Sequence, residues 1–189
     1  MINHVTRRTA LIGLSAVTVF PVHAQSAPAG GPKQEDAEYA ELERPAVFDV
    51  VSTTGSLKET AQKGQELIWH RKGASAERRF QVTNIAVAFL RSETGGQVKM
   101  TFSCNVSSLG YGVEEAKLNV IVRSKGGGAM YTWSLGIAVK CADKNQSLTP
   151  LTQEVPNDVA ANVFTNAGGI EVTEYTEPNF PGVKVQRCG

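Results

Sequence analysis

Strict alternation of apolar and polar residues over two long stretches constrains the fold most strongly. From Tyr131 to Cys141 the odd-numbered residues are aromatic, aliphatic or cysteine, and the even-numbered residues are mostly small or polar. Val98–Ser108 alternates in the same way, with apolar residues at its even-numbered positions. A period of two is typical of a β-strand with one buried face. Both stretches are therefore expected to be antiparallel strands that share one core, with Trp133 buried in it.

The same β-rich pattern, interrupted by turn sequences, continues from Pro45 to the C-terminus. Two segments have helix signals: Ser56 and Glu59 have capping-box spacing, and Pro156 and Gly168 stand where a short helix would begin and end. Strands outnumber helices and do not alternate with them regularly. We therefore predict an all-β fold, a two-layer antiparallel β-sandwich with one or two short helices. The alternative is a small β-barrel.

The first 24 residues have the layout of a cleavable export signal. Arg7 and Arg8 precede an apolar run that ends at Pro21, and cleavage is expected before Gln25. About eleven apolar residues give a helix of only about half the hydrocarbon thickness, so an integral membrane span is not expected. The protein should be exported, periplasmic or secreted, by either the general or the twin-arginine route.

The rest of the sequence divides at Pro45. Residues 25–44 are rich in Ala, Pro, Gly and charged side chains and have little to bury, so we expect a flexible leader. Residues 45–189 are expected to form a single β-sandwich domain. A mature chain of about 165 residues is long enough for one substantial core.

The charge of the mature chain bears on its partners. The full sequence has 19 Lys and Arg residues against 18 Asp and Glu residues, and loss of Arg7 and Arg8 leaves 17 against 18. A nearly neutral chain has no electrostatic footprint for a polyanion. Nucleic acid is therefore not expected as a partner, and the sequence leaves the oligomeric state open.

Among the three cysteines of an exported chain a disulfide is expected, because the compartment is oxidising. Cys104 and Cys141 each continue the apolar face of their strand, whereas Cys188 lies on the opposite parity to Val183 and Val185. We therefore predict a Cys104–Cys141 disulfide. The alternative pairing, Cys141–Cys188, would fasten the C-terminal strand.

Catalytic chemistry has little support in the sequence. His70 is the only histidine outside the export signal, so any Ser-His-Asp arrangement or multi-histidine metal site would depend on it. No catalytic residue, metal ligand or cofactor is predicted. The alternative is a small extracytoplasmic hydrolase that uses a pair of carboxylates, such as Glu171 and Glu174, together with His70.

The densest cluster of basic residues lies between His70 and Arg79. A positive patch of this kind suits an acidic protein or an anionic glycan, although Glu77 balances it in part. The candidate partner-binding residues are His70, Arg71, Lys72, Arg78, Arg79 and the aromatic Tyr131. We predict an exported, non-catalytic binding module or accessory subunit that contacts another protein or a glycan through its loops or a sheet edge.

Overall fold

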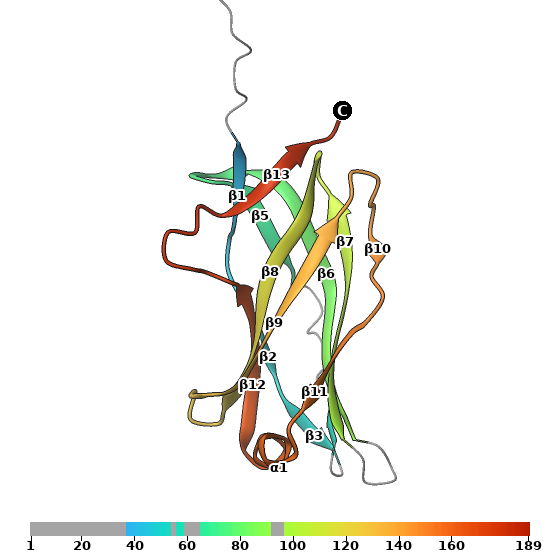
Figure 1. The fold of residues 1–189 in the computed structure, drawn as a ribbon, viewed down its shortest axis with the longest axis vertical. Coiled ribbons are helices and arrows are strands. Elements are labelled where there is room, and N and C mark those ends of the chain that lie inside the picture. The colour runs from blue at the N-terminus through green and yellow to red at the C-terminus, as the bar shows by residue number, and fades with distance from the viewer. Residues whose placement is uncertain (1–36, 54–55, 59–64, 92–96) are drawn as a thin grey trace, which may run out of the picture. The chain divides into compact units, whose positions relative to one another are not determined.

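The computed structural model describes residues 37–53, 56–58, 65–91 and 97–189, with the backbone alone for 51–53 and 56–58. These residues are mostly in strands, with one short helix (Figure 1). The strands are β1 (Glu38–Leu42), β2 (Ala46–Asp49), β3 (Val51–Thr53), β4 (Ser56–Lys58), β5 (Leu67–Arg71), β6 (Ala74–Arg91), β7 (Val98–Ser108), β8 (Tyr111–Ser124), β9 (Ala129–Val139), β10 (Gln146–Ser147), β11 (Leu151–Val155), β12 (Ala167–Glu174) and β13 (Val183–Arg187); the helix is α1 (Asn157–Asn166).

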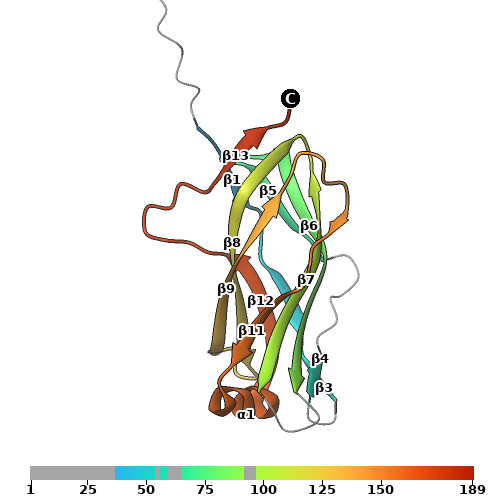
Figure 2. The same cartoon turned by 45° about the vertical axis from the view of Figure 1, so that its right-hand side comes forward.

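The strands pair antiparallel in the order β10-β7-β6-β5-β1-β13-β8-β12-β2, with β11 on β7, β9 on β8, and the β3–β4 pair on β6. One layer contains β5, β6 and β7, and the other contains β8, β9 and β12. Strands β1 and β13 connect the layers at one end of the domain (Figure 2). The predicted all-β, sandwich-like fold is confirmed. Within the described residues the sheet does not close on itself, so the alternative barrel is not formed.

The core is one cluster of aliphatic and aromatic side chains between the layers. On β9 the alternation predicted from the sequence is observed: Trp133, Leu135, Ile137 and Val139 are buried, and the residues between them are exposed. Tyr131, at the start of this stripe, is half-buried. The apolar face of β9 is therefore an inner face of the sandwich, as predicted.

Helix α1 begins directly after Pro156, as the sequence predicts, and packs Ala160 and Val163 into the core near one end of the sandwich (Figure 1). A helix after Ser56 was the other possibility. That interpretation is wrong for its first residues, because Ser56–Lys58 is strand β4 and pairs with β3 and β6. The rest of that segment, 59–64, lies outside the described residues.

The sequence predicts a flexible leader over residues 25–44, but the last part of this segment contains strand β1. This strand pairs with β5 on one side and β13 on the other. Its central residue, Ala40, is completely buried. The sequence of β1 hides this role, because it buries one small side chain among charged neighbours. Residues 25–36 of the predicted leader, and the predicted export signal, lie outside the described residues.

The predicted Cys104–Cys141 disulfide is wrong. Cys141 is bonded to Cys188, with the two Cα atoms 5.5 Å apart, and Cys104 is a buried free thiol. The parity argument failed because β9 ends at Val139, so Cys141 lies in the following turn and is exposed. Cys104 instead occupies the middle of β7 and faces the core. Its burial raises the pKa of the Cys104 thiol to about 12, so it stays protonated and unreactive at neutral pH.

Candidate functional site

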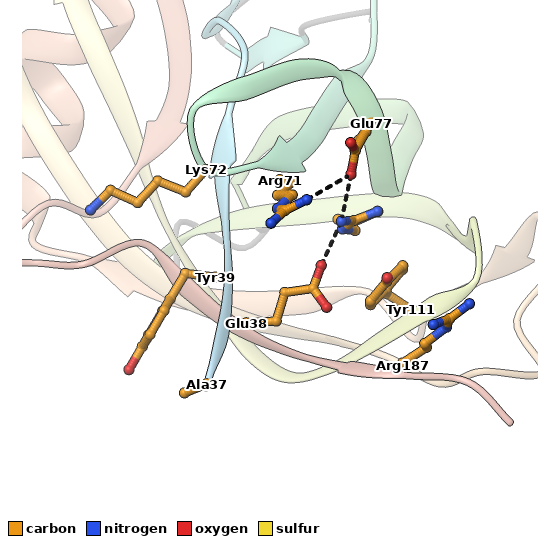
Figure 3. A pocket seen from close by; sticks show the side chains of 9 residues that line it. Ala37, Glu38, Tyr39, Arg71, Lys72, Glu77, Tyr111 and Arg187 are labelled. Atoms are coloured by element: carbon orange, nitrogen blue, oxygen red, sulfur yellow. Dashed lines mark hydrogen bonds and ion pairs between the residues drawn. The ribbon is translucent and has the colours of Figure 1, made fainter. Parts of the chain in front are cut away.

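A pocket of about 520 Å³ opens where β1, the β5–β6 turn, the start of β8 and the end of β13 meet (Figure 3). Four segments that are far apart in the sequence contribute to it. We call it the basic pocket, and its lining residues are Ala37, Glu38, Tyr39, Arg71, Lys72, Glu77, Arg79, Tyr111 and Arg187. Figure 3 shows Lys72 and Tyr39 on one side of β1, with Glu38, Arg71, Tyr111 and Arg187 on the other.

The β5–β6 turn delivers Arg71 and Lys72 to this pocket. Arg71 pairs with Ala74 across the turn, and Gly73 has a φ of 76°, which glycine adopts without the clash of a Cβ atom. Two hydrogen bonds hold the turn against β1. The Lys72 backbone N–H donates to the Tyr39 carbonyl, and the Gly73 N–H donates to the Glu41 carboxylate, each at 2.9 Å. The turn is therefore fixed to the strand that forms the middle of the pocket.

Arg79 is the structural anchor of the basic pocket. Arg79 is only 8% exposed. Its guanidinium lies 2.5 Å from the Glu38 carboxylate and 3.0 Å from the Glu77 carboxylate. The guanidinium carbon also lies 4.1 Å from the centroid of the Tyr111 ring, within the range of a cation–π contact. A buried Arg that is paired with two carboxylates joins β1, β6 and β8. Arg79 is thus committed to the fold rather than to a ligand.

Three other cations in the basic pocket are exposed. The Arg71 side chain is 56% exposed and lies 3.5 Å from Glu77, which already accepts a hydrogen bond from Arg79. Lys72 and Arg187 are exposed, and neither makes an ion pair with a described residue. With Arg79 and Glu38 balancing each other, the basic pocket carries an excess of positive charge at its surface.

His70, a candidate partner-binding residue in the sequence, does not line the basic pocket. It is only 5% exposed, and its Nε2 lies 3.1 Å from the Glu43 carboxylate. The burial follows from position, because His70 pairs with Glu41 of β1 and with Arg78 of β6 in the middle of the sheet. The hydrogen bond to His70 lowers the pKa of Glu43.

Glu174 holds the adjacent junction of the two layers. One of its carboxylate oxygens accepts a hydrogen bond of 3.0 Å from the Trp69 indole N–H, and the other accepts one of 3.4 Å from the Leu42 backbone N–H. This carboxylate therefore ties the end of β12 to β5 and β1. Its burial raises the pKa of Glu174, although both hydrogen bonds act in the opposite direction.

The raised pKa of Glu174 predicts a specific dependence of stability on pH. A carboxyl whose folded-state pKa is raised stabilises the fold below its unfolded pKa, and this contribution is lost as the pH rises through the folded pKa. Glu174→Gln cannot ionise but keeps an oxygen for the Trp69 N–H. We expect the melting temperature of this variant, relative to wild type, to be higher at about pH 7 than at about pH 4. A difference that stays constant over this range in differential scanning calorimetry would contradict the burial argument.

The structure brings together only part of the predicted site. Arg71, Lys72 and Arg79 line the basic pocket, whereas Arg78 is exposed but does not line it. Tyr131 pairs with Val122 near the far end of β8. Eleven residues of strand separate that position from Tyr111, a distance of roughly 35 Å. Tyr131 therefore cannot act in one site with the basic residues.

Five pocket residues could not be found from the sequence as members of this site. Ala37, Glu38 and Tyr39 lie in the segment interpreted as a leader. Tyr111 and Arg187 come from strands whose pairing was unknown, and they lie directly opposite each other in the β8–β13 ladder. The one sequence signal that could have placed Arg187 was the alternative Cys141–Cys188 disulfide, because that bond fixes the end of β13, where Arg187 lies.

The residues of the alternative hydrolase are engaged elsewhere. Glu171 forms an ion pair with Arg123, while Glu174 accepts the Trp69 hydrogen bond. His70 is buried, and its Nε2 lies 3.1 Å from the Glu43 carboxylate, so each of these three groups has a partner within the fold.

Comparison with known proteins gives no family or relative for this chain. No protein-family model, curated protein or solved structure matches it. In the part of the chain that the structure describes, no helix has the length and apolar character needed to cross a membrane. The same residues contain no group of three or more His, Cys, Asp or Glu side chains arranged to hold a metal ion.

Proposed function

We propose that this protein is an exported, non-catalytic binding module, and that its basic pocket holds an anionic group of a partner protein or glycan. The single observation that carries the proposal is the arrangement of exposed cations around a structured pocket. Arg71, Lys72 and Arg187 line it, while the buried Arg79 pairs with the two acidic residues of the pocket, Glu38 and Glu77.

The chemistry of the pocket favours a carboxylate or a sulfate. A guanidinium donates two parallel hydrogen bonds to either group. Arg187 makes no ion pair with a described residue, and Arg71 lies 3.5 Å from Glu77 with its side chain 56% exposed. Tyr111 and Tyr39 add aromatic surface that a sugar ring or an apolar side chain can contact. The ligand is therefore expected to combine a negative group with a less polar neighbouring part.

The pocket is preorganised for such a ligand. The ion pairs of Arg79 hold β1 and β6 together, and the Cys141–Cys188 disulfide fixes β13 one residue beyond Arg187. A site whose backbone is already fixed loses little conformational entropy on binding. This supports a binding role for the pocket, and the disulfide also suits an oxidising compartment outside the cytoplasm.

The experiment is a calorimetric titration of the mature protein with two probes, a sulfated heparin fragment and a polyglutamate peptide. Binding of the first probe indicates a glycan ligand, and binding of the second indicates an acidic protein. We expect Arg71→Ala/Arg187→Ala to weaken binding of the preferred probe by about tenfold or more, the equivalent of losing two exposed charge-assisted contacts. Binding should also weaken as salt is added.

Arg78→Ala is the control for the Arg71 substitution, because it removes one arginine from the same hairpin at a position outside the pocket. It should change the affinity by less than about twofold. If wild type binds neither probe at low salt, or if Arg78→Ala weakens binding as much as the double variant, the proposal is wrong.

A further inference from the structure

Among the described strands, β9 is paired on only one side, while α1 and β7 lie close to parts of it without pairing. It pairs with β8, and no other described strand pairs with its outer edge. We infer that this edge is an interface at which two copies of the protein pair antiparallel, so that the β8–β9 layers of both copies form one continuous sheet. This inference concerns a surface separate from the basic pocket and goes beyond the proposed function.

The composition of β9 is unusual for a free edge. An exposed edge strand presents unpaired N–H and C=O groups, and proteins that remain monomeric protect such edges with short strands, prolines, bulges or charges. β9 is eleven residues long, and Ala129–Val139 contains no proline and no charged residue. From Tyr131 to Ile137 its pairing with β8 is regular, without a bulge. This edge therefore carries none of the usual protection along its central part.

The other free edges among the described residues differ from it. β10 has two residues, and β11 has five residues, includes Glu154, and lies between Pro150 and Pro156. β2 has four residues, follows Pro45 and ends at Asp49. β3, which pairs only with β4, has three residues. Each of these edges is short, and β2 and β11 also contain a charged residue and adjoin a proline. The contrast indicates that β9, unlike the others, is covered in the working protein.

Symmetry restricts how two copies of β9 can meet. Residues that face each other in an antiparallel pair point to the same side of the sheet, so buried positions must oppose buried positions. The two-fold axis therefore passes between the two copies of one residue, which face each other across the interface. Ser134, the middle residue of β9, is the residue placed at the axis. With Ser134 on the axis, Trp133 faces Leu135 of the second copy. These two are the most exposed residues of the buried stripe, at 8% and 7%.

The side chains of β9 suit a second copy of this chain. Since the strand is uncharged, self-pairing places no like charges opposite each other. Thr132 faces Gly136 on the exposed side, where both are small enough for close approach. Beside the strand, Glu115 and Lys117 of β8 line a pocket with Ser134 and Gly136, so each copy places one charge of each sign near the axis. A closed two-fold contact also limits assembly to a dimer, which would carry two basic pockets.

The test is the mass of the mature protein in solution, measured by analytical ultracentrifugation over a range of concentrations. Wild type should sediment as a dimer. Ser134→Lys should sediment as a monomer of half that mass, because the two lysines would meet at the axis. Ser134→Thr, which keeps a neutral hydroxyl and favours strands, should remain dimeric. Since Ser134 is exposed in the monomer, all three proteins should keep the wild-type near-UV circular dichroism spectrum.

A cysteine at the axis tests the register. Ser134→Cys should form a disulfide-linked dimer under oxidising conditions, seen on a non-reducing gel, whereas Ala138→Cys should not, because it faces Met130 of the second copy. A monomeric wild type at all concentrations would overturn the inference and leave the edge to another occupant. A dimer whose mass Ser134→Lys does not change would overturn it as well.

Discussion

Replacing Trp69 with alanine is expected to lower the free energy of unfolding by about 3 to 5 kcal/mol. Trp69 is completely buried and stacks on Phe80, with ring centroids 4.5 Å apart and planes inclined by 15°. Its indole N–H also donates to Glu174 at the junction of the two layers. The variant therefore loses a large apolar side chain and leaves a part-buried carboxylate without its donor. Urea denaturation followed by circular dichroism measures the loss.

Trp69→Phe separates the two contributions. Phenylalanine keeps an aromatic ring against Phe80 but has no N–H, so we expect a smaller loss of about 1 to 3 kcal/mol. If Trp69→Ala and Trp69→Phe are equally destabilised, the packing contribution is negligible and the account of this junction is wrong. An unchanged midpoint for both variants would be incompatible with the burial of Trp69.

The disulfide provides the second large effect. Cys141→Ser/Cys188→Ser is expected to destabilise the fold by about 4 kcal/mol in the chain-entropy account of a disulfide, because the bonded residues are 47 apart in sequence. The same variant frees the end of β13, so Arg187 is no longer held at the basic pocket. Binding of the preferred anionic probe should therefore weaken as well. Denaturation and calorimetric titration of one sample measure both effects.

Cys104→Ala is the control for this prediction. Cys104 is buried and unpaired, so its loss should cost only about 1 kcal/mol and should leave probe binding unchanged. Peptide mapping under non-reducing conditions should recover Cys141 linked to Cys188, with Cys104 alkylated only after denaturation. Recovery of a Cys104–Cys141 peptide would contradict the pairing described above.

The sequence was informative where a feature depends on local periodicity. The alternation in β9 predicted the strand and the burial of Trp133, and Pro156 predicted the start of α1. Both signals involve residues that are neighbours in sequence. The parity argument failed for Cys141 because it extended the strand period past Val139, where the strand ends.

The candidate site was less predictable, since four distant segments build it. The basic hairpin was visible in the sequence, but the membership of Glu38 and Arg187 depends on β1 and β13 pairing with each other. β1 has no apolar alternation that would predict a strand, because it buries only one small side chain, Ala40, completely. Its place between β5 and β13 depends on pairing with distant segments. The burial of His70 was unpredictable for a related reason, since it depends on β5 lying between β1 and β6 in the sheet.

The most direct test of the binding proposal is to map the contact surface by nuclear magnetic resonance. Adding the sulfated heparin fragment or the polyglutamate peptide to the isotope-labelled mature protein should shift backbone amide signals of the basic pocket. The account predicts the largest shifts for residues 37–39, 71–72, 111 and 187, and none for the β9 residues around Ser134. Shifts centred on another surface, or no shifts with either probe, would contradict the assignment of this pocket as the binding site.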